Sequence, residues 1–239
     1  MKSQYVLPIT IVVAGGLIAG AVFLAGKAGT PGPNTDGQAT NVRAYTPGVD
    51  HILGNPNAKV MVVEYMDLEC QHCKVFNTTM HQIMAYYGTS GKVAWVQRPL
   101  PLGQIHSKAL QEAHAAECAA AQGGDTAYFA YTDKIFEITP SNNGLDLAEL
   151  PKIAKEIGLN VAAFDTCMSE GKFNEKITTS YNEGIAAGAQ GTPYTLIMVG
   201  TDTVVLNGAQ PYDSMRAAID TLLEDLGTPV TPAASTTTQ

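Results

Sequence analysis

Two cysteines separated by two residues are the part of this sequence best suited to chemistry. Cys70 and Cys73 form a C-x-x-C motif, and the small disulfide that such a pair closes can be made and broken by thiol–disulfide exchange. A zinc site would need a second C-x-x-C or two regularly spaced histidines, and the other cysteines, Cys118 and Cys167, stand alone in the sequence. We therefore expect a redox pair and no metal, with an inert structural disulfide and a zinc site as the alternatives.

The pair lies where a predicted strand passes into a predicted helix. Lys59–Met66 is an apolar run of strand length without alternation, which is typical of a strand covered on both faces. A helical pattern follows from Lys74 to Tyr87 and stops at Gly88. Unpaired amides and the macrodipole at a helix N-terminus stabilise an anion, so the sequence predicts a Cys70 thiolate with a lowered pKa.

The remaining segments predict a domain of the α/β class. A second strand at 92–97 should be broken by Arg98–Leu102, since proline cannot donate to a sheet. An alanine-rich helix at 107–122 should end at Gly123-Gly124, before another helix through Glu137. The other expected segments are helices at about 146–157, 161–169, 173–188 and 211–226, and strands at 194–199 and 201–206.

Beyond the C-x-x-C, a series of segments resembles, in order, the DsbA-like thiol:disulfide oxidoreductases. The segments are Gly54–Ala58, Glu64–Cys73, Arg98–Leu102 with His106, Ala113–Gly123, Phe136, Ile157–Leu159, Phe164–Gly171 and Gly191–Pro193. The resemblance covers nearly all of residues 45–226. It implies a thioredoxin fold with an inserted α-helical domain at about residues 102–180.

The resemblance also implies roles for single residues. Cys70 would be the exposed nucleophile and Cys73 its buried partner. Pro193 would be a cis-proline facing the pair, and with Thr192 it would bind an extended substrate. His72 would help to hold the Cys70 thiolate, which makes the disulfide a stronger oxidant. A trans loop proline and a solvated turn histidine are the alternatives for Pro193 and His72.

Two further positions concern proton transfer and redox potential. Glu64 matches an acidic residue that relays a proton to Cys73, and its apolar strand favours a raised pKa. A salt-bridged structural glutamate is the alternative. We place Gln71 among the substrate-contacting residues. Relatives often carry proline at this position, so the redox potential of the pair stays uncertain and both the oxidase and the reductase directions stay open.

Cys118 and Cys167 match positions where some relatives carry a second cysteine pair. The resemblance thus implies a structural disulfide within the helical insertion, with two free buried thiols as the alternative. A stable disulfide requires an oxidising compartment. We therefore expect the domain to lie outside the cytoplasm.

The ends of the chain differ from the domain in composition. Tyr5–Gly26 contains 22 residues without a charge, enough to cross a bilayer. We expect a transmembrane anchor at 1–26, with a cleaved signal peptide or a buried helix as alternatives, and a cytoplasmic N-terminus. A flexible linker at 27–47, the DsbA-like domain at 48–226 and a disordered tail at 227–239 complete the expected organisation.

The composition excludes one class of partner. The net charge of −8 argues against nucleic-acid binding, which needs a basic face. We expect a membrane-anchored, extracytoplasmic oxidoreductase that forms disulfides in reduced exported proteins, without a cofactor. The resemblance implies reoxidation by a quinone-linked membrane protein of the DsbB or vitamin K epoxide reductase (VKOR) type. A disulfide reductase or isomerase and a non-enzymatic anchored peptide-binding domain are the alternatives.

Overall fold

The structure is a computed structural model that describes residues 42–200 and 202–227. The predicted anchor at 1–26, most of the predicted linker at 27–47 and all but the first residue of the predicted tail lie outside the described residues. In the part of the chain that is described, no helix combines the length and the apolar character needed to cross a membrane.

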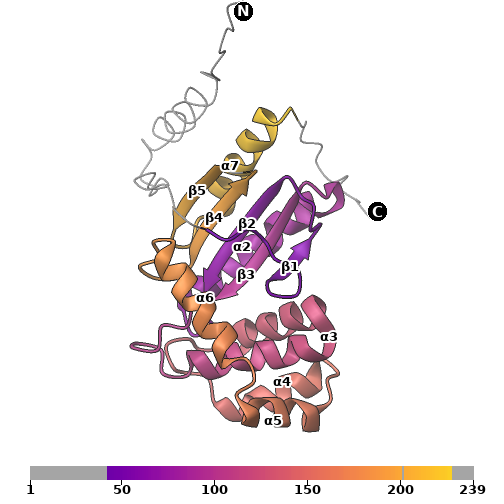
Figure 1. Cartoon of the computed structure of the whole chain (residues 1–239), viewed down its shortest axis with the longest axis vertical. Coiled ribbons are helices and arrows are strands. Elements are labelled where there is room, and N and C mark those ends of the chain that lie inside the picture. The colour runs from indigo at the N-terminus through magenta and orange to yellow at the C-terminus, as the bar shows by residue number, and fades with distance from the viewer. Residues whose placement is uncertain (1–41, 201, 228–239) are drawn as a thin grey trace, which may run out of the picture.

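A five-stranded mixed sheet forms the centre of the domain (Figure 1). The strand order is β1 (His51–Gly54), β3 (Val93–Pro99), β2 (Val60–Met66), β4 (Tyr194–Val199) and β5 (Asp202–Asn207). β2 runs parallel to β3, and the other neighbours are antiparallel. β2 is thus the middle strand and is buried on both faces, which explains its unbroken apolar run.

Helices cover both faces of the sheet. α2 (Gln71–Tyr87) and α7 (Tyr212–Asp225) pack on one face, and α6 (Asn174–Ala186) packs on the other. α6 approaches the sheet closely at Gly184, where a Cβ atom would lie 2.4 Å from the Leu100 side chain. A larger residue would also meet the Tyr65 ring at 2.8 Å, so glycine lets α6 pack this close to the sheet.

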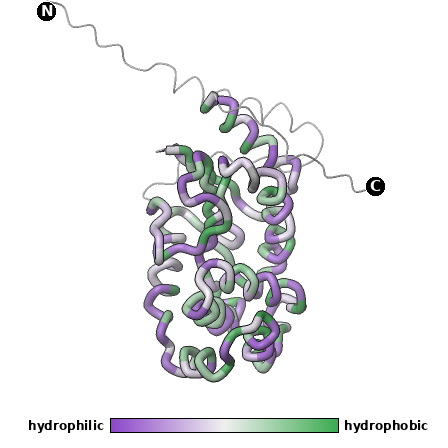
Figure 2. Tube along the Cα trace, turned by 90° about the vertical axis from the view of Figure 1, so that its right-hand side faces the viewer, coloured by the Kyte–Doolittle hydropathy of each residue, from purple (hydrophilic) through white to green (hydrophobic). Residues whose placement is uncertain are grey.

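The inserted helices form a separate layer at one end of the sheet (Figure 1). They are α3 (Ala109–Ile138), α4 (Leu150–Glu156) and α5 (Val161–Glu170), with a short 3₁₀ turn at Leu147–Glu149 before α4. α3 is broken at Gly123 and Gly124, whose backbone angles are not helical, so the predicted break is confirmed. Hydrophilic and hydrophobic residues alternate along these helices, as expected for helices with one buried side (Figure 2).

Two details of the sheet differ from the sequence-based prediction. β3 continues through Arg98 and Pro99, although proline was expected to break it. The proline is tolerated because β1 pairs only with residues 94–97, while the hydrogen bond to β2 at this point comes from the amide of Leu100. β1 was not predicted, since four residues are too few for a periodic pattern.

Candidate active site

The two cysteines of the C-x-x-C motif open helix α2. Cys70 has an extended backbone and precedes the helix, and its carbonyl accepts a hydrogen bond from the amide of Lys74 at 3.1 Å. Cys73 follows in the first turn. Both are free thiols in the structure. The helix start thus places one sulfur at the N-terminal amides and the other directly behind it.

The surroundings of the two thiols differ. Cys73 is fully buried, and the amide of Asp67 donates to its sulfur at 3.5 Å. Cys70 was expected to be exposed, but only 7% of it is accessible. The reason is the segment before β4, where the carbonyl oxygen of Thr192 lies 3.4 Å from Cys70 Sγ. Cys70 is still the one of the two sulfurs that a substrate can reach.

The segment facing Cys70 carries the predicted cis-proline. The Thr192–Pro193 peptide bond is cis, so the trans alternative is wrong. Pro193 is buried directly before β4. The Thr192 hydroxyl is not in full hydrogen-bond geometry with any described group, but it lies close enough to Cys70 to favour the thiolate. Cys70, Thr192 and Pro193 are therefore brought together as expected, although 122 residues separate Cys70 from Thr192.

The hydrogen bonds at the helix start separate the acidities of the two thiols. The hydrogen bond from Cys73 lowers the pKa of Cys70 to about 5 against the opposing effect of burial, with further help from the Thr192 side chain and the amides of Cys73 and His72. Burial, followed by the interaction with Cys70, raises the pKa of Cys73 well above that of a free thiol. Near neutral pH the pair therefore consists of a Cys70 thiolate and a Cys73 thiol.

Glu64 lies in β2 beneath this pair. It is 1% exposed, and its Oε2 accepts a hydrogen bond from Trp95 Nε1 at 2.9 Å. Burial raises the pKa of Glu64 to about 8; the bonds from Trp95 and Gln97 oppose this rise, and the Cys70 charge adds to it. The ion pairs of the described residues do not include Glu64, so the alternative of a salt-bridged glutamate is wrong; its role as a proton relay stays a prediction.

The two residues between the cysteines lie on the surface. Gln71 and His72 are exposed on the first turn of α2. His72 contributes its backbone amide to the low pKa of Cys70. The role of its imidazole and the contact of Gln71 with substrate stay predictions.

Comparison with known proteins agrees with this geometry. Residues 46–221 match the family described as thioredoxin. A crystal structure of Pseudomonas aeruginosa DsbA2 is 28% identical, superposes with a TM-score of 0.61 and covers 74% of this chain and 96% of its own. Wolbachia pipientis alpha-DsbA1 is 26% identical, with a TM-score of 0.66 over 76% of this chain and 94% of its own. The chain belongs to the DsbA-like thiol:disulfide oxidoreductases of the thioredoxin family.

Similar sequences also occur inside longer proteins. The Na(+)/H(+) antiporter NhaA 1 of Mycobacterium sp. (strain KMS) is 32% identical over 126 residues, or 53% of this chain. The DsbA-like chain spans only 19% of that antiporter's length. The similarity thus concerns one segment of the antiporter and is no argument for ion transport.

Asp67 is a further residue of the DsbA-like site, to which the sequence assigned no role. It is 1% exposed, and its carboxylate accepts hydrogen bonds from the amides of Glu69 at 2.8 Å and Leu102 at 2.7 Å. His106 Nδ1 lies 2.9 Å from the same carboxylate. Asp67 therefore ties the segment before Cys70 to the segment that follows β3. Its place directly after an apolar strand is the sequence signal that could have identified it.

Glu69 connects the active-site turn to the helical layer. Its carbonyl accepts a hydrogen bond from the amide of Asn142 at 2.8 Å, and its carboxylate accepts one from the amide of Asn143. Glu112 faces the same carboxylate, and burial followed by the bond to Glu69 raises the pKa of Glu112 to about 9. Glu112 therefore keeps its proton near neutral pH. Sequence reasoning missed this cluster because its members come from three separate segments.

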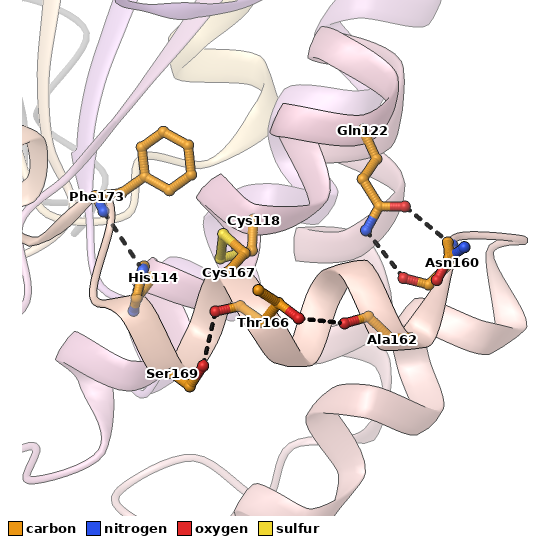
Figure 3. Close-up of a disulfide and its surroundings, with 9 residues drawn as sticks. All are labelled: His114, Cys118, Gln122, Asn160, Ala162, Thr166, Cys167, Ser169 and Phe173. Carbon is orange, nitrogen blue, oxygen red and sulfur yellow. Dashed lines mark hydrogen bonds between the residues drawn. A yellow bond between two sulfur atoms is a disulfide. The ribbon is translucent and has the colours of Figure 1, made fainter.

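The second cysteine pair forms the predicted disulfide. Cys118 of α3 is bonded to Cys167 of α5, so the alternative of two free thiols is wrong (Figure 3). His114 lies beside it and accepts a hydrogen bond from the amide of Phe173 at 3.4 Å. Burial lowers the pKa of His114, and its ring nitrogen and the two sulfurs lie within 4.8 Å of one another. The sulfurs are bonded to each other and are therefore not available as metal ligands in this state.

The acidity of Cys70 can be measured by thiolate absorbance. In the reduced protein, absorbance near 240 nm should fall with a midpoint near pH 5 as the Cys70 thiolate takes up a proton. Alkylation of Cys70 should be insensitive to pH above 6 and should slow below 5, because the thiolate is the nucleophile. Cys70→Ser is the control, in which this transition must be absent. A midpoint near 8.5, the value of a free cysteine, would contradict the geometry.

Glu64 can be followed through the only tryptophan of the chain. Because Trp95 donates to Glu64, its fluorescence should change with a midpoint near pH 8 in the reduced protein. Glu64→Gln should remove that transition. The variant should also be more stable, by roughly 2–4 kcal/mol at pH 8, because the folded protein no longer buries an ionisable acid.

The sign of the stability effect follows from proton uptake. Folded Glu64 keeps its proton up to about pH 8, whereas an unfolded glutamate loses it near pH 4.3. The unfolded state therefore binds fewer protons between these values, and Glu64 makes stability fall as pH rises through this window. Urea denaturation at pH 5 and pH 8 should show this slope in the wild type and a smaller one in Glu64→Gln. Equal slopes in the wild type and in Glu64→Gln would show that Glu64 is ionised in the folded protein over this pH range.

Proposed function

We propose that the protein is an extracytoplasmic thiol:disulfide oxidoreductase that forms disulfide bonds in exported proteins. The observation that carries this proposal is the Cys70 thiolate, whose pKa of about 5 lies well below that of a free cysteine. A thiolate of low pKa is a good leaving group and stabilises the reduced form of the pair. The disulfide form is correspondingly oxidising.

The reaction consists of two exchanges. A substrate thiolate attacks Cys70 Sγ in the Cys70–Cys73 disulfide, and Cys73 leaves as a buried thiolate. Glu64, which is protonated below about pH 8, gives its proton to that thiolate. A second substrate thiolate then attacks the substrate sulfur of the mixed disulfide, and Cys70 leaves as a thiolate. Two substrate thiolates are thereby oxidised to one disulfide, and the enzyme pair accepts the two electrons.

The segment Thr192–Pro193 is the proposed binding site for the substrate chain. It lies directly before β4 and faces Cys70, with the Thr192 carbonyl 3.4 Å from the reactive sulfur. An extended peptide can pair with backbone groups at such a position, as in strand addition. Gln71 and His72 are exposed on the first turn of α2, where their side chains would contact the substrate. Selection of the substrate thus depends on its extended backbone next to a cysteine.

The proposed location and partners rest on separate arguments. A structural Cys118–Cys167 disulfide is typical of proteins in oxidising compartments. The uncharged segment in residues 1–26 would tether the domain to a membrane with its N-terminus in the cytoplasm. Reduced exported proteins would be the substrates. A quinone-linked membrane protein of the DsbB or VKOR type would remove the electrons from the reduced pair.

The redox potential of the Cys70–Cys73 pair tests the direction of electron flow. The protein is equilibrated with glutathione mixtures, and the reduced fraction is read from Trp95 fluorescence and from trapped thiols. We expect a potential above about −180 mV, in the oxidising range of the family. A value near −270 mV, typical of thioredoxin, would support the reductase alternative. A pair that stays unreactive with glutathione would support the peptide-binding alternative.

A further inference from the structure

The sulfur of Cys73 receives a hydrogen bond from the backbone of Asp67. The Asp67 amide nitrogen lies 3.5 Å from Cys73 Sγ, and Cys73 is fully buried. Burial, the interaction with Cys70 and the Glu64 charge all raise the pKa of Cys73, whereas the bond from Asp67 lowers it. The Asp67 amide is therefore a donor aimed at the sulfur that becomes charged when the disulfide is attacked, at a place where bulk water cannot solvate that charge.

The peptide unit that carries this amide is also held at its other end. The carbonyl of Met66 belongs to the same peptide unit and points away from the amide, as in any trans peptide. It accepts a hydrogen bond from the amide of Leu100 at 2.7 Å. Such a bond polarises the peptide and strengthens its N–H as a donor. The carbonyl of Asp67 in turn accepts a bond from the amide of Cys70 at 3.1 Å, so the backbone is fixed on both sides of Asp67.

The side chain of Asp67 holds the same stretch of backbone. Its Oδ1 accepts a hydrogen bond from the amide of Glu69 at 2.8 Å, which closes a turn typical of aspartate. Its Oδ2 accepts one from the amide of Leu102 at 2.7 Å and lies 2.9 Å from His106 Nδ1. A buried carboxylate cannot turn away from these donors without leaving polar groups unpaired. The carboxylate therefore fixes the direction of the Asp67 amide.

His106 belongs to the turn that supplies both donors to Oδ2. Its amide bonds to the carbonyl of Leu102 at 2.9 Å, so its ring and the Leu102 amide are presented by one short turn after β3. The residue is 6% exposed. His106 thus holds the Asp67 carboxylate from a segment 39 residues further along the chain.

We infer that Asp67 and His106 are positioning residues for the first exchange, because they hold the Asp67 amide against the sulfur that leaves. This inference rests on the proposed function. In the disulfide, Cys73 Sγ is neutral and a weak acceptor. As a substrate thiolate bonds to Cys70 Sγ, the S–S bond breaks and its electron pair stays on Cys73. The proton that then neutralises this sulfur comes from Glu64, as proposed above.

The contribution of the amide grows during this step. A hydrogen bond to a charged acceptor is stronger than one to a neutral acceptor, so the bond from Asp67 strengthens as charge develops on Cys73. An interaction that is stronger in the transition state than in the ground state increases the rate. Because the amide is already aligned by the Asp67 carboxylate, little reorganisation is needed when the S–S bond breaks.

Reduction of the oxidised full-length protein by dithiothreitol tests this role, because attack on Cys70 releases Cys73. Stopped-flow Trp95 fluorescence reports the reaction, and Cys70→Ser/Cys73→Ser shows any contribution from the second disulfide. In Asp67→Ala the rate should fall roughly tenfold or more, since the amide is no longer held in line with the sulfur.

A second buried carboxylate serves as the matched control. Glu117 is also 1% exposed and also lies beside a histidine, with His51 Nε2 3.1 Å from its Oε2. Its other partner is Lys176 of α6, so its contacts lie outside the active-site turn. Glu117→Ala should leave the rate of reduction within about twofold of the wild type, because distant sites act independently. Equal slowing in Glu117→Ala and Asp67→Ala would overturn the inference.

The second exchange separates positioning from general damage to the turn. Cys70 is the leaving group in that step, and it can be followed in Cys73→Ser as the attack of added thiol on a mixed disulfide between Cys70 and glutathione. Adding Asp67→Ala to this variant should change the rate by less than about twofold, because the sulfur that the amide faces is absent. A rate that falls as much as in the first exchange would assign Asp67 a structural role and overturn the inference.

Conservative variants of His106 supply a further comparison. His106→Gln can still donate to the Asp67 carboxylate, whereas His106→Leu cannot. Loss of one such bond should slow the first exchange about threefold in His106→Leu, and His106→Gln should retain most of the rate. If Asp67→Ala does not fold, judged by circular dichroism, this pair decides. Unchanged rates in Asp67→Ala and His106→Leu would overturn the inference, as would equal slowing in His106→Leu and His106→Gln.

The two proposals can fail independently. Reduction by dithiothreitol measures the release of Cys73 in either direction of physiological electron flow. A reducing potential of the Cys70–Cys73 pair would refute the oxidase while leaving the effect of Asp67 on this step intact. Unchanged rates in the Asp67 and His106 variants would refute the positioning role while leaving the oxidase intact.

Discussion

Cys70→Ser should lose all dithiol-oxidising activity, a fall of at least about 10³-fold in the rate at which a reduced substrate protein is refolded. The reason is that substrate thiolates attack Cys70 Sγ, and serine offers neither a disulfide to attack nor a thiolate of pKa about 5 to leave. Recovery of activity by a substrate ribonuclease, with glutathione disulfide as the oxidant, measures the rate. The variant should refold the substrate no faster than glutathione disulfide alone.

Two matched variants show whether the loss concerns the nucleophile itself. Cys73→Ser keeps Cys70 but lacks the thiol behind it, so it should accumulate mixed disulfides with substrate, visible as adducts on non-reducing gels. Replacing both Cys118 and Cys167 by alanine should change the initial rate by no more than about twofold relative to the wild type, because that pair lies in the helical layer. The rate is measured below the unfolding temperature of the variant. Full activity in Cys70→Ser would refute the proposed mechanism.

Removing the second disulfide should have the largest effect on stability. The Cys118–Cys167 bond closes a loop with a sequence separation of 49 residues, for which loop-closure entropy predicts a loss of about 4 kcal/mol. For a domain of this size, that corresponds to a fall in Tm of roughly 8–16 °C. Urea denaturation and thermal melting of Cys118→Ala/Cys167→Ala measure the change. Both cysteines are replaced so that no unpaired thiol is left in the core.

The comparison must be made with the active-site pair in one defined state. Cys70→Ser/Cys73→Ser serves as the parent, since it fixes that state and keeps the second disulfide. A loss below about 1 kcal/mol would show that α3 and α5 are held together by packing alone.

The thiolate titration of Cys70 should keep its midpoint in Cys118→Ala/Cys167→Ala, because α3 and α5 do not supply the groups that lower its pKa.

Local patterns predicted much of the site. The apolar run before Cys70 predicted a strand buried on both faces, and β2 is the middle strand of the sheet. The helix that begins after Cys70 places the Cys73 thiol and the backbone amides that lower the pKa of Cys70. Gly123-Gly124 marks the break in α3. Each of these features depends on residues within a few positions of one another, where propensity and periodicity are informative.

Features that depend on strand register or on distant segments were not predictable. Gln97 lies beside Glu64 only because β2 and β3 pair in a particular register. The low exposure of Cys70 depends on Thr192, which comes from the far side of the helical insertion. Pro99 stays in β3 because its neighbour β1 is short. No single segment of the sequence contains this information.

The contact of Glu69 with residues 141–143 has a consequence for how the protein can diversify. Ser141, Asn142 and Asn143 all have positive φ angles, and the residue directly before Cys70 holds this loop by backbone and side chain. The loop belongs to the helical layer, whereas Glu64 and Trp95, beneath the nucleophile, belong to the sheet. The groups that set the reactivity of Cys70 and the loop that borders the active-site turn thus belong to different parts of the chain. Substitutions in residues 141–143 would change the surroundings of this turn while leaving the partners of the Cys70 sulfur in place.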